Sequence, residues 1–264
     1  MSLRHLIFVL LVAWTAEVRA ETATIAVAAN FVETLHALVR DFEATSPHRL
    51  RVSVGSTGAL YAQVRNGAPF DVMLAADQTR PMRLVEEGYA VQGSRFTYAV
   101  GQLVLWSADA DFVEELNGEL ATDLAANPAD RIAIANPELA PYGLAAKQAM
   151  QALGIWPEVA KRVVMGANVG QAHTMVATGN AKAGFIALSY LRSGDGPVQG
   201  SYWKVPSMLH DPILQDGVVL KRGESNDAAK AFVAWLASDA ARDTLVRYGY
   251  GAAALPDGQD HMRP

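Results

Sequence analysis

The sequence predicts an α/β protein with two lobes, each built on a mostly parallel sheet flanked by helices. From Thr22 onward, short apolar runs alternate with stretches of helical periodicity, which is the pattern of repeated strand–helix units. The run from Phe70 to Ala76 is almost continuously apolar, as in a strand covered on both faces. The chain of 264 residues is also longer than one typical core requires. The alternative to two lobes is one large α/β unit.

Three strand–helix units are expected in the first part of the chain. The helix after the first strand has an apolar face that includes Phe31 and Leu35, and Asn30 with Glu33 has the spacing of a capping box. The expected elements are strands at 24–29, 50–54 and 70–76, a helix beginning at Asn30, a polar turn at 55–58 and a helix at 59–65.

The strand–helix plan then restarts, which favours a second lobe. A β-rich stretch comes first, and two helices close the chain and are expected to return to the first lobe. The expected elements are the stretch at 96–106, strands at 131–135, 163–167, 183–188, 203–205 and 218–220, and helices at 144–153, 226–236 and 240–248. Residues 257–264 form a polar tail.

The first twenty residues have the layout of a cleaved secretory signal. Arg4 and His5 precede the apolar segment 6–14, and Val18-Arg19-Ala20 provides a small residue at the cleavage point. A membrane anchor is the alternative, but a spanning helix needs roughly 20 apolar residues. The chain contains no cysteine, which excludes a disulfide framework and a lipid-bearing cysteine. We therefore expect an exported, periplasmic protein.

The charge of the chain disfavours polyanionic partners. Its formal net charge is −5, and the first twenty residues hold two arginines and one glutamate, so the remainder is slightly more acidic. Nucleic acid and anionic membrane surfaces are poor partners for such a chain.

The segment from Asn136 to Gly143 predicts a helix N-terminus that is presented to a ligand. A β-branched run ends at Ala135, an alanine-rich helix begins by Leu144, and Pro137 and Pro141 restrict the backbone between them. The first N–H groups of a helix have no intrahelical partner and favour an anion. This turn can therefore hold an anion without a cation.

Three further turns share this design of a strand, small neutral donors and then a helix. Each alone is more simply an ordinary capped turn, because Asn and Ser are common helix caps. Together they are expected at the carboxyl ends of strands, where open α/β sheets bind ligands. The turns are Ala29-Asn30, Ser56-Thr57-Gly58 and Asn168-Val169-Gly170-Gln171.

The absence of charge in these turns favours a fully deprotonated anion. A doubly charged oxyanion without a proton needs donors only, whereas phosphate keeps a proton part of the time and is served by a carboxylate acceptor. Asp77 is the nearest carboxylate in sequence, but it is more simply interpreted as a helix cap. Hydrogen bonds to a charged group are worth roughly 1.5 to 3 kcal/mol each, so several of them can offset desolvation of the anion.

Enzymatic and metal-binding interpretations find little support. Val54-Gly55-Ser56-Thr57-Gly58 lacks the leading glycine of a nucleophile elbow, and no phosphate-binding glycine loop is present. The histidines have no metal-ligand spacing, and we interpret them as surface or structural residues: His36, His48, His173, His210 and His261. We expect no enzyme activity, no cofactor and no direct metal ligands.

With these turns in order, the chain resembles the molybdate-binding periplasmic proteins of ABC importers, a branch of the type II periplasmic binding proteins. The resemblance runs from about Ala23 to Tyr250. Its landmarks are Ala28-Ala29-Asn30-Phe31, Gly55-Ser56-Thr57-Gly58, Asn66-Gly67-Ala68-Pro69, Ala75-Ala76-Asp77, the segment 136–143 and Asn168-Val169-Gly170-Gln171-Ala172.

The resemblance implies two lobes joined by two crossing segments, with the oxyanion in the cleft between them. The implied division is a signal peptide at 1–20, a first lobe at 21–101 and 206–264, and a second lobe at 102–205. Asn30 and Thr57, with Ser56 beside it, match side-chain donors of the first lobe, and Tyr142 and Val169 match main-chain donors of the second. Some relatives have a ligand-touching tyrosine where Ala187 stands, and Tyr190 cannot be assumed to replace it.

The resemblance also implies a monomeric solute-binding protein that captures molybdate, and tungstate as well, and delivers it to an ABC-type membrane permease. Tyr142 offers either its backbone N–H alone or its hydroxyl as well. The main alternative is a binding protein for another oxyanion, such as sulfate, or for an organic acid. Two different classes of protein are further alternatives: an enzyme on the same fold, and a periplasmic sensor or scaffold lobe that binds no ion. Enzymes that polymerise porphobilinogen share this architecture but attach their cofactor through a cysteine.

Overall fold

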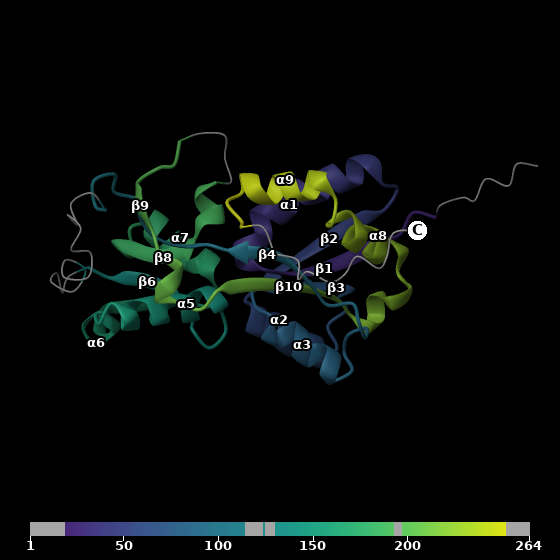
Figure 1. The fold of residues 1–264 in the computed structure, drawn as a ribbon, viewed down its shortest axis with the longest axis horizontal. Coiled ribbons are helices and arrows are strands. Elements are labelled where there is room, and N and C mark those ends of the chain that lie inside the picture. Colours follow the sequence, from purple (N-terminus) through teal and green to yellow (C-terminus); the bar gives the residue numbers. More distant parts are fainter. Residues whose placement is uncertain (1–18, 114–123, 125–129, 193–196, 252–264) are drawn as a thin grey trace, which may run out of the picture.

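Two five-stranded sheets lie side by side in the protein, and helices cover both of them (Figure 1). The structure, a computed structural model, describes residues 19–113, 124, 130–192 and 197–251. Residues 1–18 of the expected signal, the expected tail at 257–264 and His261 lie outside the described residues. No helix in the described ranges is long and apolar enough to cross a membrane.

The strands and helices follow the expected alternation. The strands are β1 (Thr22–Ala28), β2 (Arg49–Gly55), β3 (Val72–Leu74), β4 (Phe96–Gly101), β5 (Leu103–Ser107), β6 (Ile132–Ala135), β7 (Val163–Gly166), β8 (Ala183–Ala187), β9 (Ser201–Lys204) and β10 (Ile213–Val219). The α-helices are α1 (Val32–Thr45), α2 (Thr57–Arg65), α3 (Thr79–Glu86), α5 (Pro141–Ala152), α6 (Trp156–Val159), α7 (Val169–Ala177), α8 (Asp227–Trp235) and α9 (Asp239–Arg247). The 3₁₀ helices are η1 (Ala29–Phe31), η2 (Ala160–Arg162), η3 (Leu188–Leu191), η4 (Ser207–Leu209) and η5 (Lys221–Ser225).

The two sheets share one topology. The strand order is β2-β1-β3-β10-β4 in the first sheet and β7-β6-β8-β5-β9 in the second. The first three strands of each sheet run parallel, and one strand, β10 or β5, runs against both of its neighbours. The carboxyl ends of β1, β2 and β3 therefore meet at one edge of their sheet, as do those of β6, β7 and β8.

Among the described strands, the chain crosses between the sheets twice. β4 of the first sheet ends at Gly101 and β5 of the second begins at Leu103, so Gln102 alone separates them. The return lies between β9, which ends at Lys204, and β10, which begins at Ile213. The expected β-rich stretch at 96–106 is thus two strands in different sheets, and each antiparallel strand is the first one after a crossing. The lobe boundaries at Gly101 and Pro206 stay a prediction.

Apolar faces hold helices on both sides of the first sheet. On one side, α1, α8 and α9 pack on alternate residues of β1, with Phe42 against Phe232 at a ring-centroid distance of 5.5 Å. On the other side, α2 and α3 bury Leu60 and Leu84 against Met73. Burial of such side chains contributes about 1.5 to 3 kcal/mol each relative to exposure. The packed sheet therefore holds the ends of its strands in fixed positions.

Candidate functional site

Helix starts from both lobes surround one small cavity. It lies where the carboxyl ends of β1, β2 and β3 face those of β6 and β7, as expected for a ligand site in an α/β fold. The lining residues are Ala28, Ala29, Asn30, Ser56, Thr57, Ala76, Ala140, Pro141, Tyr142, Asn168 and Val169. All five residues predicted for the site are therefore brought together.

Every one of these lining residues is neutral, and several are alanines. The polar groups that remain are hydroxyls, amides and backbone N–H groups. Small side chains let the backbone of the helix starts approach whatever occupies the cavity. The arrangement is suited to a ligand that accepts hydrogen bonds and brings its own negative charge.

Two hydroxyls from α2 line the first-lobe side. Ser56 is the N-cap of α2, and its Oγ accepts the Ala59 N–H at 3.3 Å. The Thr57 Oγ1 accepts the Ala76 N–H at 3.0 Å. A hydroxyl has one proton to donate beside its acceptor lone pairs. Because both oxygens already accept a backbone N–H, each hydroxyl retains its proton for a ligand in the cavity. Capping and ligand binding are thus compatible at Ser56.

The second-lobe side offers backbone N–H groups. Pro141, at the first position of α5, has no N–H, while Gly143 and Leu144 both donate to the Ala140 carbonyl. Among the described residues, the N–H of Tyr142 finds no acceptor, as expected for a group in the first helical turn. Gly143 lets α5 pack this closely, because a Cβ there would lie 2.2 Å from the Ala135 oxygen.

The start of α7 repeats this arrangement. The Asn168 side chain caps the helix by accepting the Gln171 N–H at 3.1 Å. Within the described part of the chain, the Val169 N–H donates to no acceptor, and Val169 is buried against the cavity. The predicted turn at 168–171 is therefore a capped helix start that also presents a free donor.

Asn30 departs from two expectations, the capping box and the side-chain donor to the ligand. The predicted capping box is wrong, because α1 begins after Phe31 without a side-chain cap. The Asn30 Nδ2 instead donates to Gln215 Oε1 at 2.9 Å and to the Tyr250 hydroxyl at 3.2 Å. Both amide hydrogens are thereby used inside the first lobe. The donor that Asn30 has left for the cavity is its backbone N–H, in the first turn of η1.

The Tyr142 hydroxyl points to the crossing segments. Tyr142 is 2 % exposed, and its hydroxyl accepts from Gln215 Nε2 at 3.3 Å. A Cβ at Gly101 would lie 2.3 Å from the same oxygen, so the hydroxyl packs on the backbone where the chain leaves the first lobe. Burial raises the pKa of Tyr142 well above its ordinary value, partly offset by the bond from Gln215. The hydroxyl is therefore neutral and belongs to a buried network.

That network continues through aromatic hydroxyls of the first lobe. Gln215 Oε1 also accepts from the Tyr98 hydroxyl at 3.0 Å, and the Tyr250 hydroxyl donates to the Asn30 carbonyl at 2.7 Å. Burial raises the pKa of Tyr250 to about 12, against the lowering effect of its hydrogen bonds. The turn that carries Asn30 is consequently fixed by neutral groups.

The cleft is closed on both sides of the cavity. On one side, the Gly58 N–H donates to the Leu139 carbonyl at 2.8 Å, and Arg80 Nη2 donates to the Glu138 carbonyl at 2.8 Å. On the other side, the Ser189 and Tyr190 hydroxyls reach the carbonyls of η1. Ala187 is fully buried in β8, and neither it nor Tyr190 lines the cavity. The structure thus shows the two lobes in contact.

Neither Asp77 nor any histidine in the described ranges lines the cavity. Asp77 accepts the Arg80 N–H at 2.9 Å and pairs with the Arg80 side chain, so it supports the first turn of α3, although the N-cap residue is Gln78 and not the predicted Asp77. His173 is stacked between Trp106 and Tyr190, and burial lowers its pKa. His48 is buried with its Nδ1 facing the Glu21 N–H at 3.2 Å, and His36 is exposed. No cluster of potential metal ligands occurs in the described ranges.

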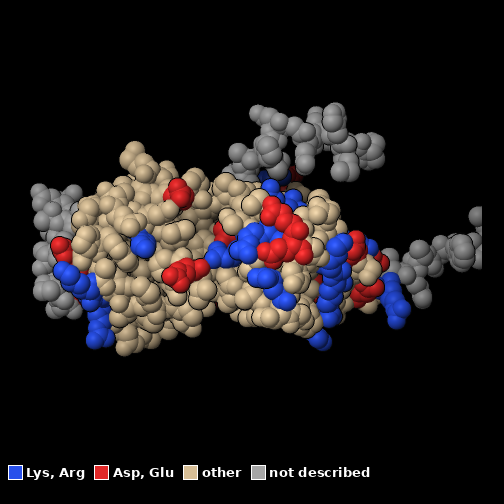
Figure 2. All heavy atoms as spheres, turned by 90° about the horizontal axis from the view of Figure 1, so that it is seen from below, with Lys and Arg blue, Asp and Glu red and all other residues tan. Residues whose placement is uncertain are grey.

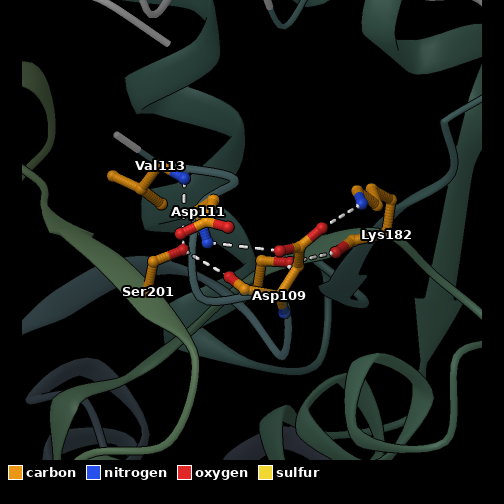
Figure 3. Close-up of polar contacts among 6 residues, drawn as sticks. Asp109, Asp111, Val113, Lys182 and Ser201 are labelled. Carbon is orange, nitrogen blue, oxygen red and sulfur yellow. Dashed lines mark hydrogen bonds and ion pairs between the residues drawn. The ribbon is translucent and has the colours of Figure 1, made fainter. Parts of the chain in front are cut away.

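Away from the cavity, several charged side chains form ion pairs with residues of opposite sign. Lys and Arg lie beside Asp and Glu over the lobe that carries α2 and α3, while the face of the other lobe is mostly uncharged (Figure 2). At the end of the second sheet opposite the cavity, Asp109 pairs with Lys182 at 2.6 Å, and Ser201 Oγ donates to the Asp109 carbonyl at 2.6 Å (Figure 3). These bonds fasten the loop after β5 to β8 and β9.

Comparison with known proteins assigns the family. Residues 23–251 match the family described as bacterial extracellular solute-binding protein. The chain belongs to this family. The sequence is 45% identical over 233 residues to the molybdate-binding protein ModA of Azotobacter vinelandii. This match covers 88% of the present chain and 91% of the relative. The sequence is also 45% identical over 225 residues to ModA of Rhodobacter capsulatus, covering 85% of this chain and 86% of the relative.

A solved structure has the same fold as this solute-binding protein. The periplasmic molybdate-binding protein of Azotobacter vinelandii superimposes with a TM-score of 0.83 at 38% identity. The match covers 88% of this chain and 99% of that structure. The two-lobed periplasmic binding protein fold predicted from the sequence is therefore confirmed.

Proposed function

We propose that this protein binds molybdate, and tungstate as well, in the cavity between its lobes and delivers the anion to an ABC-type membrane permease. The observation that carries the proposal is the convergence of four helix starts, two from each lobe, on one cavity whose lining residues are all neutral. The relatives from Azotobacter and Rhodobacter, which are molybdate-binding proteins by name, support the same ligand.

The groups proposed to bind the anion are the Ser56 and Thr57 hydroxyls and the backbone N–H groups of Asn30, Tyr142 and Val169. All are donors, so they suit an oxyanion that carries no proton at neutral pH. Bonds from these groups to a charged oxygen are worth roughly 1.5 to 3 kcal/mol each, because one partner is ionised. The protein provides no direct metal ligand in this proposal, and no cofactor or catalytic step is invoked.

Selection against sulfate follows from the fixed spacing of the donors. Helix starts held by packed sheets cannot all move inward, so an anion with shorter bonds from its centre to oxygen leaves some donors out of reach. Each donor left unpaired in a buried site costs about 1 to 3 kcal/mol. Phosphate is disfavoured for a different reason, because its proton needs an acceptor and no carboxylate lines the cavity.

Binding is proposed to favour the closed cleft, since each lobe supplies only part of the donor set. A ligand shifts a conformational equilibrium by its differential affinity for the two states. The closed form then presents both lobes to the permease in one arrangement. We further propose that residues 1–20 direct export, that the remaining chain acts in the periplasm as a monomer, and that nucleic acid is not a partner.

A thermal-shift series tests the proposal. The protein is refolded from denaturant to remove retained ligand and then heated with molybdate, tungstate, sulfate, phosphate or small carboxylates. A ligand at 100 times its dissociation constant stabilises by about 2.7 kcal/mol. We expect large shifts with molybdate and tungstate only. A shift with sulfate or a carboxylate and none with molybdate would reject the proposal in favour of another anion.

A further inference from the structure

Two hydroxyls of the second lobe bind the turn of the first lobe that faces the cavity. Tyr190 and Ser189 lie in η3, directly after β8. The Tyr190 hydroxyl donates to the Ala29 carbonyl at 2.7 Å, and the Ser189 Oγ donates to the Asn30 carbonyl at 2.7 Å. Both acceptors belong to η1, so these are short bonds between the lobes.

The bond from the Tyr190 hydroxyl acts on the peptide group whose N–H, that of Asn30, is proposed to donate to the anion. The Ala29 carbonyl and the Asn30 N–H are the two ends of a single peptide unit. A donor placed on the carbonyl polarises that unit and strengthens hydrogen bonding by its N–H, because hydrogen bonds in a chain reinforce one another. The Tyr190 hydroxyl thereby influences the Asn30 N–H without lining the cavity.

The surroundings hold both hydroxyls in place. The Tyr190 ring is stacked on His173 at a centroid distance of 4.8 Å and an interplanar angle of 8°, and His173 is stacked on Trp106 at 5.0 Å. Ser189 is only 4 % exposed. Little side-chain entropy is lost when the Tyr190 bond forms, because stacking within the second lobe already restricts that ring.

We propose that Tyr190 and Ser189 are positioning residues for the anion: they lock η1 of the first lobe onto η3 of the second and orient and polarise the Asn30 peptide. This inference rests on the proposed function, since it concerns the same cavity. The bonds exist only when the lobes are in contact, so they add to the stability of the closed form and slow the release of ligand.

The pair touches no ligand atom in this account, which separates it from the residues that do. Its loss is expected to weaken every anion that the closed cavity accepts by the same factor. The ratio of affinities between any two anions that bind the parent measurably is therefore expected to stay constant. A residue in contact with the anion would change that ratio between anions of different size.

The test uses Tyr190→Phe, which keeps the stacked ring and removes only the hydroxyl. Tyr202→Phe is the matched control, because Tyr202 lies on β9 of the same lobe and its hydroxyl contacts only Arg192, at 3.5 Å, among the described residues. Dissociation constants for molybdate, tungstate, sulfate and phosphate are measured by calorimetry on refolded protein, and release rates by stopped flow. The melting temperature without ligand is recorded for each variant.

We expect Tyr190→Phe to weaken every anion that binds the parent protein by about three- to tenfold, the value of one neutral hydrogen bond, with most of the change in the release rate. Ser189→Ala is expected to act in the same direction, Tyr202→Phe to leave affinity unchanged, and ligand-free melting temperatures to stay at the parent value.

Failure of this inference is distinguishable from failure of the proposed function. If the parent binds molybdate and Tyr190→Phe binds it equally well, or if the ratio of affinities between two anions that bind the parent changes, only the inference is overturned. If the parent binds sulfate or phosphate but not molybdate, the proposed function fails, and the same variants test the inference with that anion. If none of the four anions binds the parent, both fail.

Discussion

Replacing Thr57 with valine removes one hydroxyl that performs two separable tasks. The Thr57 Oγ1 accepts the Ala76 N–H at 3.0 Å, and its proton is the proposed donor to the anion. Thr57 is 1 % exposed and Ala76 is 2 % exposed, so neither group can turn to water instead. Valine has nearly the same shape, so the change removes hydrogen bonds without opening a cavity.

Each task has its own expected magnitude. Loss of a hydrogen bond to a charged ligand costs roughly 1.5 to 3 kcal/mol, which weakens molybdate binding by about 10- to 100-fold. The Ala76 N–H left without a partner lowers the free energy of unfolding by about 1 to 3 kcal/mol. For a protein of this size, that lowers the melting temperature by about 2 to 4 °C per kcal/mol.

Calorimetric titration and thermal unfolding without ligand measure the two effects. Thr244→Val is the control, since Thr244 is a buried threonine of α9 that does not line the cavity, and its hydroxyl accepts from Arg247 at 3.2 Å. We expect that control to keep the parent affinity. Thr57→Val with lowered stability but parent affinity for molybdate would refute the reasoning, because the hydroxyl would then serve the fold alone.

Three further changes probe other parts of the site. Tyr142→Phe keeps the backbone N–H and loses one neutral hydrogen bond from Gln215, so the molybdate affinity measured by calorimetry should fall less than about tenfold. A larger loss would indicate that the hydroxyl donates to the anion. Gly58→Ala sets a Cβ 3.1 Å from the Leu139 backbone across the closed cleft, so it should weaken molybdate binding. The melting temperature without ligand should stay the same or rise, because alanine favours a helix. An unchanged molybdate affinity would contradict the role of this contact in the closed form. Burial lowers the pKa of His173, so its contribution to stability is fully present above its ordinary value of 6.5 and is lost as pH falls below that value. The melting temperature should therefore fall more steeply between pH 7 and pH 5 for the parent than for His173→Gln. If the two melting temperatures fall in parallel, His173 does not contribute to the loss of stability in acid.

The positions of the turns could be predicted because their signals are local. Strand-like runs that end at Ala28, Gly55, Ala135 and Gly166 are each followed within two residues by Asn or Ser, so short windows suffice to locate each turn. The parallel order of the strands then brings these ends together, which the general rule for α/β sheets anticipates. For the same reason, all five predicted residues line one cavity, while their role as anion ligands stays a prediction.

The directions of the side chains could not be predicted, because they depend on distant partners. The Asn30 amide is turned away from its own helix by Gln215 and Tyr250, which lie 185 and 220 residues further along the chain. The Tyr190 hydroxyl finds the Ala29 carbonyl 161 residues away. The division of 96–106 between two sheets at Gln102 could not be predicted, because both halves are β-rich and only one residue separates them. Gln215 and Ser189 carried no local signal at all.

The most direct test of the donor-only site is a crystal structure of the molybdate complex, with molybdenum located by its anomalous scattering. We expect one molybdenum in the cavity between the lobes, with anion oxygens about 2.7 to 3.1 Å from the hydroxyls of Ser56 and Thr57 and from the N–H groups of Asn30, Tyr142 and Val169. Molybdenum outside this cavity, or an anion held there by a lysine or arginine side chain, would contradict it.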